Sequence, residues 1–190
     1  MNNICFIDNF HRSKIFKSIT KNLKKKNVYW ITTNFFFFNK NKNIFKEKIL
    51  YLNKETKSKK TNFFREQKIN EIFYSDRILK KISKSYKYLE IFEENIYDFL
   101  KKNNIKVVIG EFTWAHELLT YRITKNNKDL NCNYYNIQPL RLPYSYSGFF
   151  TLEDQSELKE IGLNRNKNFN LNNKSYKKVV SKKTDYNFFN

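Results

Sequence analysis

The sequence has few of the residues that build phosphate loops, disulfide frameworks and metal sites. Its 190 residues include only 3 glycines, 2 cysteines and 2 histidines. It contains neither the G-x-G-x-x-G pattern nor a Walker A loop, the glycine-rich turns that hold phosphate groups. Two cysteines make neither a disulfide framework nor a four-ligand zinc site by themselves. We therefore expect no metal and no cofactor, with Cys5 and Cys132 as buried free thiols.

A membrane-spanning stretch is also missing. The apolar run Phe35–Phe38 has only four residues, far fewer than a bilayer requires. Residues 1–9 carry no basic segment, so they do not resemble a signal peptide. These features predict a cytoplasmic protein, with peripheral contact at the inner membrane face as a further option. The Phe35–Phe38 run itself predicts either the end of a buried strand or an exposed hydrophobic patch.

Acidic residues are scarce beside basic ones. The chain has 37 Lys+Arg against 18 Asp+Glu, a formal net charge of +19. The excess is mostly lysine, and arginine, the residue suited to bidentate contacts with phosphates and bases, is sparse. Lysine, asparagine, isoleucine, phenylalanine and tyrosine are together what AT-rich coding favours. The charge is therefore interpreted either as coding bias on a solvated surface or as a surface that binds polyanions or membranes.

Apolar residues are plentiful, and their spacing predicts an α/β fold. Hydrophobic residues make up 40% of the chain and aromatic residues 18%, enough to build a core. Short continuous apolar runs predict strands buried on both faces, at Ile4–Ile7, Val28–Thr32, Ile49–Leu52, Ile105–Ile109 and Cys132–Ile137. Helical spacing predicts helices over about 10–26, 85–103 and 113–126. This alternation is typical of a Rossmann-like three-layer domain with a mainly parallel sheet.

The C-terminal part has a different character. Residues 144–153 are aromatic and predicted to be irregular, and 154–161 are predicted to form a short helix. Residues 164–178 are rich in asparagine and lysine. We therefore expect a Rossmann-like domain over residues 1–157 and an irregular, loosely ordered tail over 158–190.

The segment after the strand at 105–109 holds the principal candidate site. It reads GEFTWAHE from Gly110 to Glu117, with Thr113 as the expected helix N-cap. Open α/β sheets bind ligands at the carboxyl ends of their strands. Glu111 and His116 are therefore candidate catalytic groups, and Glu117 a candidate substrate ligand, able to act on a sugar hydroxyl or to bind it. The alternative is that these residues only stabilise the start of a helix.

Two other segments supply candidate substrate-binding residues. Asp8 and His11 follow the first strand and are expected at the same edge of the sheet, although helix capping would explain Asp8 equally well. Arg141 lies between two prolines, just ahead of an aromatic cluster. An arginine beside aromatic rings would suit a sugar, while the alternative is a buried hydrophobic corner.

Two stretches resemble a known class of proteins. They read GEFTWAHELLTYRI at 110–123 and RLPYSYSGFF followed by TLEDQSE at 141–157. They are similar to the N-terminal part of bacterial capsular or surface polysaccharide biosynthesis proteins, which resemble glycosyltransferases of the two-Rossmann-domain (GT-B) type. The resemblance covers roughly residues 3–157. It implies that Glu111, His116 and Glu117 line the cleft and that Arg141 lies near the loop that closes it.

The resemblance also implies partners. An N-terminal half would recognise the acceptor, a glycan or lipid-linked saccharide. A second Rossmann domain would bind the nucleotide-sugar donor, and 190 residues leave no room for one. We therefore expect a truncated enzyme or one that depends on a separate chain for the donor, which leaves open whether this chain alone is an enzyme. The alternative is a noncatalytic protein that binds nucleic acid or another polyanion, although no nucleic-acid-binding motif is present.

Overall fold

The structure is a computed structural model that describes residues 2–9, 13–21, 23, 27–53, 69–76, 87–139, 147–151 and 158–159. All of these belong to one unit, Met1–Lys159. Apart from Leu158 and Lys159, the expected tail lies outside the described residues, so the boundary at residue 157 stays a prediction.

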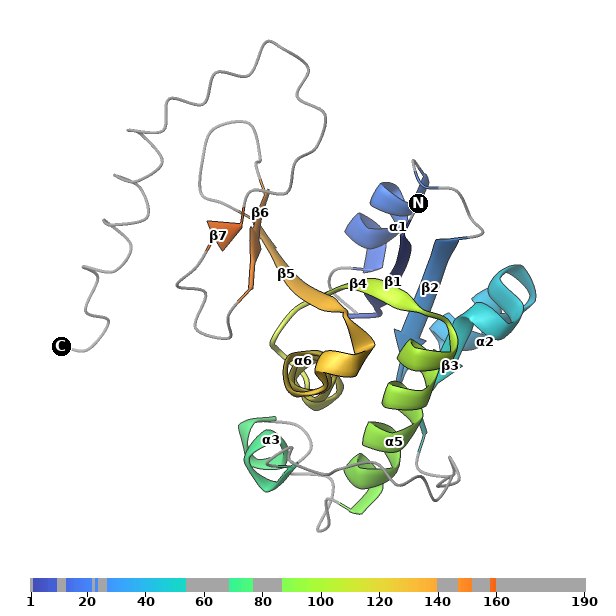
Figure 1. The fold of residues 1–190 in the computed structure, drawn as a ribbon. Coiled ribbons are helices and arrows are strands. Elements are labelled where there is room, and N and C mark those ends of the chain that lie inside the picture. The colour runs from blue at the N-terminus through green and yellow to red at the C-terminus, as the bar shows by residue number, and fades with distance from the viewer. Residues whose placement is uncertain are drawn as a thin grey trace, which may run out of the picture. The chain divides into compact units, whose positions relative to one another are not determined.

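A seven-stranded sheet forms the centre of this unit (Figure 1). Its order is β3-β2-β1-β4-β5-β6-β7. The strands are β1 (Asn3–Ile7), β2 (Val28–Thr32), β3 (Ile49–Tyr51), β4 (Ile105–Gly110), β5 (Asn133–Pro139), β6 (Ser147–Phe150) and β7 (Leu158–Lys159). The first five are all parallel, and β6 and β7 add antiparallel pairings. The predicted α/β Rossmann-like fold with a mainly parallel sheet is confirmed.

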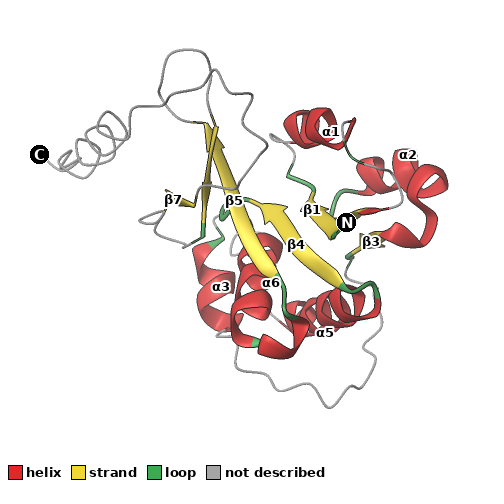
Figure 2. Ribbon diagram, turned by 45° about the horizontal axis from the view of Figure 1, so that its top comes forward, coloured by secondary structure: helices red, strands yellow, loops and turns green. Residues whose placement is uncertain are grey.

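Helices cover both faces of the sheet. The helices are α1 (Ser13–Lys21), α2 (Phe35–Phe45), α3 (Ile69–Ser75), α5 (Lys87–Lys102) and α6 (Ala115–Asn126), with short 3-10 turns η2 (Lys46–Lys48) and η3 (Lys128–Leu130). Figure 2 shows α1 and α2 on one side of the strands and α3, α5 and α6 on the other. The arrangement therefore has three layers, as predicted.

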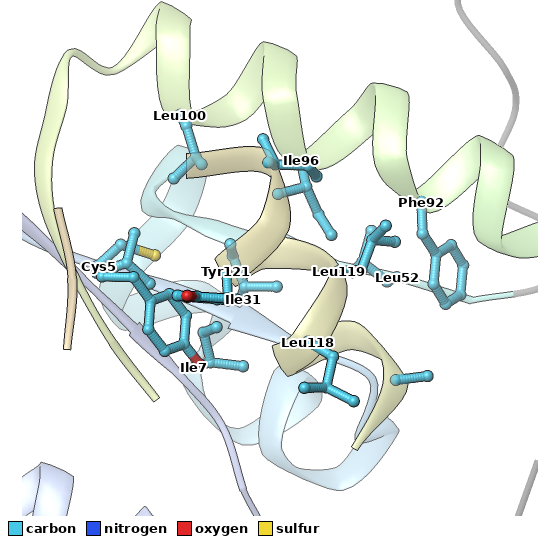
Figure 3. Packing of buried hydrophobic residues seen from close by; sticks show 14 of the residues in the cluster. Cys5, Ile7, Ile31, Leu52, Phe92, Ile96, Leu100, Leu118, Leu119 and Tyr121 are labelled. Carbon is cyan, nitrogen blue, oxygen red and sulfur yellow. The ribbon is translucent and has the colours of Figure 1, made fainter. Parts of the chain in front are cut away.

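Alternate residues of each central strand feed two separate cores. On β1, Cys5 and Ile7 face the α5–α6 layer, whereas Phe6 faces α1 and α2. The first core receives Ile96 and its neighbours from α5 (Figure 3). In the second, the Trp30 ring lies 5.4 Å from that of Phe6. Because both faces are covered, these strands are apolar at nearly every position, with exceptions such as Asn3 and Lys106 near the starts of β1 and β4, which is why continuous runs predicted them.

Two helices near the carboxyl ends of the strands differ in detail from the prediction. Helix α1 (Ser13–Lys21) buries Phe16 fully, whereas Ile15 is 40% exposed. Helix α6 begins at Ala115, later than predicted, with Trp114 rather than Thr113 as N-cap. The Thr113 prediction is wrong because the backbone N–H groups of Thr113 and Trp114 donate to the carboxylate of Glu117, on the same helix, and that of Ala115 donates to Asp76.

The Phe35–Phe38 run forms the first turn of α2, not a strand end. The Asn34 side chain caps this turn, since its Oδ1 accepts a hydrogen bond from the Phe37 N–H at 3.1 Å. Phe37 is buried with its ring 4.9 Å from that of Trp30, whereas Phe36 is 82% exposed. The predicted exposed patch is therefore confirmed for the outer residues of the run, and the predicted buried strand end is wrong.

The segment predicted to be irregular contains β6, which pairs with β5 through the partners Ile137 and Phe149. Strand pairing satisfies backbone groups that an irregular segment would have to expose. Within 154–161, the predicted short helix is wrong at Leu158–Lys159, which form β7. The other residues of that segment lie outside the described ones.

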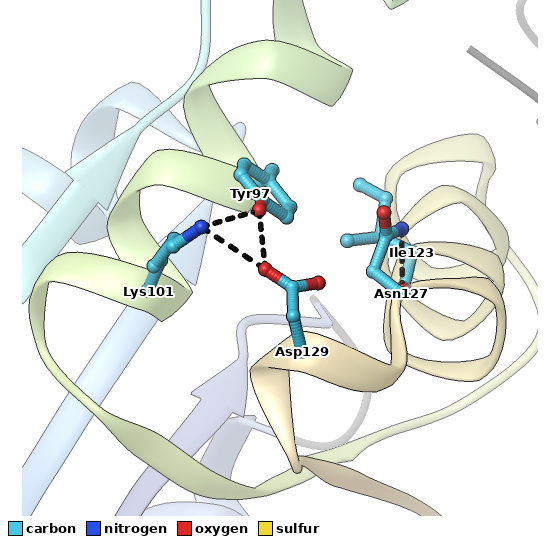
Figure 4. Close-up of polar contacts among 5 residues, drawn as sticks. All are labelled: Tyr97, Lys101, Ile123, Asn127 and Asp129. Atoms are coloured by element: carbon cyan, nitrogen blue, oxygen red, sulfur yellow. Dashed lines mark hydrogen bonds and ion pairs between the residues drawn. The ribbon is translucent and has the colours of Figure 1, made fainter. Parts of the chain in front are cut away.

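A cluster of exposed polar groups joins α5 to the α6–β5 connection (Figure 4). The Tyr97 hydroxyl donates to Asp129 Oδ2 at 2.6 Å, and Lys101 Nζ donates to both the Tyr97 hydroxyl and Asp129 Oδ2. The Tyr97 hydroxyl, and then the Lys101 ammonium, lower the pKa of Asp129. Since the groups are exposed, this cluster contributes little to stability.

Candidate functional site

The carboxyl ends of β1 and β4 lie side by side at the centre of the sheet. The two strands pair directly, with Phe6 opposite Ile109. From β1 the chain passes to α1 on one face, and from β4 to α6 on the other. Such a switch point is where open α/β sheets bind ligands. The two predicted site segments therefore meet at one edge.

Asn9 connects the two segments. Its Nδ2 donates to Glu111 Oε2 and to Glu117 Oε1, each at 3.1 Å. Asn9 is buried. The sequence left Asn9 open between capping a helix and contacting a ligand, and did not predict this role. Its place directly after a predicted strand was the only available signal, because the two carboxylates follow about 100 residues later.

Glu117 is fully buried and accepts hydrogen bonds from four groups. Besides Asn9, the donors are the backbone N–H groups of Glu111, Thr113 and Trp114, at 3.0–3.1 Å. Burial raises the pKa of Glu117 to about 7, and the hydrogen bonds limit the rise. This carboxyl group shapes the β4–α6 loop. It was predicted to bind substrate, and the structure places it beneath the surface.

Glu111 is buried as well, at 6% exposed against 0% for Glu117. Its Oε2 accepts from Asn9 and, at 3.3 Å, from the Thr113 hydroxyl. Its backbone carbonyl accepts from the Tyr134 hydroxyl at 2.6 Å, which fixes the peptide. Thr113 is exposed and Trp114 is half-buried. A carboxylate, a hydroxyl and an aromatic ring therefore adjoin at the edge.

His116 lies in the first turn of α6 and contacts the other segment. Its Nε2 is 3.4 Å from the backbone carbonyl oxygen of Asp8. Burial lowers the pKa of His116, so the ring is neutral at pH 7. A neutral imidazole can donate a hydrogen bond to the Asp8 carbonyl and so orient it, or form a hydrogen bond with another group. It adds no positive charge to the edge of the sheet.

Asp8 holds the connection between β2 and α2. Its Oδ2 accepts from the Thr32 hydroxyl at 2.8 Å, and the Thr32 oxygen accepts from the Asn34 N–H at 3.0 Å. Asp8 is buried. The structure thus brings Asp8 to the predicted edge and gives its carboxylate a positioning role.

Asp76 is a further residue that sequence analysis missed. It follows the end of α3, and its Oδ2 accepts from the Ala115 N–H at 2.9 Å, so it caps α6 from another element. In the sequence, Asp76 is an isolated aspartate after a short amphipathic segment, and nothing there indicates that it pairs with a residue 39 positions later. His11 and Arg141 lie outside the described residues, so their substrate-binding roles stay predictions.

Within the described part of the chain, no group of three His, Cys, Asp or Glu side chains is arranged to hold a metal ion. Over the same residues, no helix is long and apolar enough to cross a bilayer. No protein-family model, curated protein or solved structure matches the chain. The geometry of the edge is therefore the basis for any functional conclusion.

Proposed function

We propose that this chain is the acceptor-binding half of a GT-B-like glycosyltransferase of capsular or surface polysaccharide biosynthesis. The observation that carries the proposal is the hydrogen-bonded cluster at the switch point, where Asn9 ties the β1 turn to Glu111. Ligands of open α/β sheets bind at such an edge. The resemblance of 110–123 and 141–157 to polysaccharide biosynthesis proteins gives the ligand its class.

The groups at the edge suit a polyol. The Glu111 carboxylate can accept hydrogen bonds from sugar hydroxyls, and the exposed Thr113 oxygen, whose hydrogen is donated to Glu111, can accept one as well. The half-buried Trp114 offers a ring face for the apolar side of a sugar. Asn9 and Thr113 fix the carboxylate before any ligand arrives, which reduces the entropy lost on binding.

The site residues have different roles in this proposal. Glu111 contacts the acceptor hydroxyl and acts as its general base. His116 orients the loop through the Asp8 carbonyl, and Glu117 positions Glu111. The predicted substrate contacts of His11 and Arg141 complete the binding of an acidic or lipid-linked saccharide.

The donor is assigned to a second component. The sequence has no glycine-rich phosphate loop, and the described edge presents carboxylates rather than anion-binding groups. A nucleotide sugar would meet repulsion from these carboxylates. We therefore assign the donor to a separate nucleotide-sugar-binding chain.

The test is binding of the purified chain to an array of bacterial surface oligosaccharides, followed by titration calorimetry with the best ligand. Glu111→Gln keeps the size of the side chain but removes its charge, and is expected to weaken binding about tenfold or more. Trp114→Ala should do the same. Glu47→Gln, at an exposed glutamate of η2, is the matched control and should bind like the wild type.

Failure of the wild-type chain to bind any saccharide, or equal binding by the Glu111 and Trp114 variants, would remove the proposed site. The polyanion-binding alternative has a different signature. It predicts binding to a single-stranded oligonucleotide that falls steeply with salt and is indifferent to Glu111→Gln. Melting curves of all variants would show that each is folded.

A further inference from the structure

Helix α2 carries an unusual concentration of exposed apolar side chains. Five large hydrophobic residues are exposed in the described part of the chain, and three of them, Phe35, Phe36 and Ile44, lie on this helix. Phe36 alone is 82% exposed. Isolated exposed apolar residues are ordinary, but a cluster marks a surface that contacts a partner or a membrane.

Neighbouring aromatic rings support the two phenylalanines from below. The Phe35 ring lies 6.0 Å from that of Phe36 and 6.2 Å from that of Tyr51. Phe38 stacks on Tyr51 at 4.8 Å. Tyr51 is the last residue of β3, the edge strand. Phe35 therefore contacts both Phe36 and the stacked Phe38–Tyr51 pair, and these contacts limit how far the two exposed rings can turn inward.

Lysines surround these apolar side chains. Lys40 follows Phe36 by one helical turn and shares its face of α2, while Lys42 lies about 120° around the helix from Phe36 and Lys46 follows the end of α2. All three lysines are exposed. From Phe35 to Lys48 the chain has four lysines and a single glutamate, Glu47. We call Phe35, Phe36, Lys40, Lys42, Ile44 and Lys46 the α2 surface.

We propose that the α2 surface binds the chain peripherally to an anionic lipid bilayer. Phenylalanine and isoleucine insert at the boundary of headgroups and acyl chains, while lysines attract anionic headgroups. A second copy of the chain is a poor occupant, because two such basic surfaces repel one another. A single-stranded nucleic acid would use rings for stacking but has no use for the aliphatic Ile44.

The position of this surface fixes how the chain would lie on the bilayer. Helix α2 begins three residues after β2 ends, at the carboxyl edge of the sheet. Asp8, Thr32 and Asn34 connect that helix start to the switch point by hydrogen bonds. Docking through Phe35 and Phe36 therefore brings the carboxyl edge close to the membrane, while Ile44, in the last turn of α2, contacts it at the other end of the helix. The proposal itself does not depend on the proposed function.

The experiment is flotation of the purified full chain with vesicles of phosphatidylcholine containing about 30% phosphatidylglycerol, beside vesicles of phosphatidylcholine alone. The wild type should float with the anionic vesicles and much less with the neutral ones. Phe36→Ser should lower the partition coefficient about tenfold or more. Tyr74→Ser is the matched control, since Tyr74 is 65% exposed on α3, and it should float like the wild type.

The lysines are tested by charge reversal. Lys40→Glu should weaken binding to anionic vesicles by more than about fivefold, because removing one lysine near the surface already costs about that much. Lys102→Glu changes the net charge equally at an exposed site on α5 and should have the smaller effect. Glu111→Gln should float like the wild type, which separates this surface from the saccharide site.

Three results would overturn the proposal. The first is that the wild type stays with the unbound fraction when anionic vesicles float. The second is equal flotation of Phe36→Ser and the wild type, with melting curves showing that both are folded. The third is a single-stranded oligonucleotide that removes the wild type from vesicles and binds Phe36→Ser much more weakly, which would assign the surface to nucleic acid.

Discussion

At the scale of single residues, Glu117 explains how a loop with three inward-pointing N–H groups is stabilised. Backbone N–H groups buried without partners cost free energy. One carboxylate accepts from Glu111, Thr113 and Trp114, and also from Asn9. Full burial opposes its charge and raises its pKa to about 7. The group is therefore close to half-ionised at neutral pH.

This pKa predicts how stability depends on pH. The folded-state pKa of Glu117 lies above its ordinary value of 4.5, so between these two values the folded state holds a proton that the unfolded state has lost. The contribution of Glu117 to stability is fully present below about pH 4.5 and is lost as pH rises through 7. The loss is on the order of 3 kcal/mol.

Urea denaturation of the wild type and Glu117→Gln at several pH values measures this. Glutamine has no proton to release, so the free energy of unfolding of the wild type should fall relative to that of the variant between pH 5 and 8. Glu47→Gln, at an exposed site, should run parallel to the wild type. A wild-type stability that rises relative to Glu117→Gln over this interval would contradict the prediction.

Gly110 is a second residue with a specific requirement. A Cβ there would collide with the Tyr134 hydroxyl and would lie 3.1 Å from Ile7 Cδ1. That hydroxyl donates to the Glu111 carbonyl, so it cannot move without losing a buried hydrogen bond. Gly110→Ala should therefore lower the free energy of unfolding by about 1–3 kcal/mol.

A double-mutant cycle checks the cause. Tyr134→Phe removes the colliding oxygen and by itself should cost about 1 kcal/mol for the lost hydrogen bond. The double variant should then lose less than the sum of the two single losses, as measured by urea denaturation. Additive losses would show that Gly110 is needed for a reason unrelated to Tyr134.

At the scale of elements, α6 depends on another helix for its N-terminus. Asp76, directly after α3, accepts from the Ala115 N–H at the first position of α6. Asp76→Ala should leave that buried N–H unpaired and lower the free energy of unfolding by about 1–2 kcal/mol. Asp76→Asn keeps a side-chain oxygen and should recover part of the loss.

The matched control is Asp129→Ala, because Asp129 accepts hydrogen bonds from exposed groups. Its effect on urea denaturation should be small and should shrink further with added salt. If the Asp76 and Asp129 variants lost equal stability, the cap from α3 would have no special importance for α6.

Elements were predictable where one local signal was sufficient. Continuous apolar runs located β1, β2, β3 and β4 to within one or two residues, because burial on both faces requires apolar side chains at every position. The strand-end alternative for Phe35–Phe38 was wrong because a short apolar run has no period of its own. Only the Asn34 cap and the later helical residues identify it as the start of a helix.

The candidate site was predictable in place but not in detail. Chain order predicted that the turns after the strands at 4–7 and 105–109 meet at one edge. It could not show that Glu117 points inward or that Asn9 and Asp76 provide its surroundings, because those contacts span up to 108 residues. Glu111 and Glu117 are both buried, at 6% and 0% exposed, and their hydrogen-bond donors distinguish them: side chains for Glu111, mostly backbone N–H groups for Glu117.

At the scale of the whole molecule, one sheet separates two cores that should unfold together. Each core contains one residue whose burial can be followed during unfolding. Trp30 lies in the core with α1 and α2, and Cys5 in the core with α5 and α6. The two residues occupy neighbouring strands, with Cys5 opposite Tyr29. Losing either helical layer would expose the apolar face of the shared sheet, so neither core should persist alone.

The two probes can be followed in one protein. Trp114→Phe leaves Trp30 as the fluorophore, and Cys132→Ala leaves Cys5 as the thiol. Cys5 is fully buried with its pKa raised by burial, so it should react with a thiol reagent only on unfolding. Fluorescence and labelling should therefore give the same urea midpoint. Ile96→Ala, in the Cys5 core, should lower the free energy of unfolding by about 2–5 kcal/mol and should therefore shift both midpoints to the same lower urea concentration. A Trp30 transition that stayed in place while the Cys5 transition moved would show instead that the two layers unfold independently, with the sheet surviving the loss of α5.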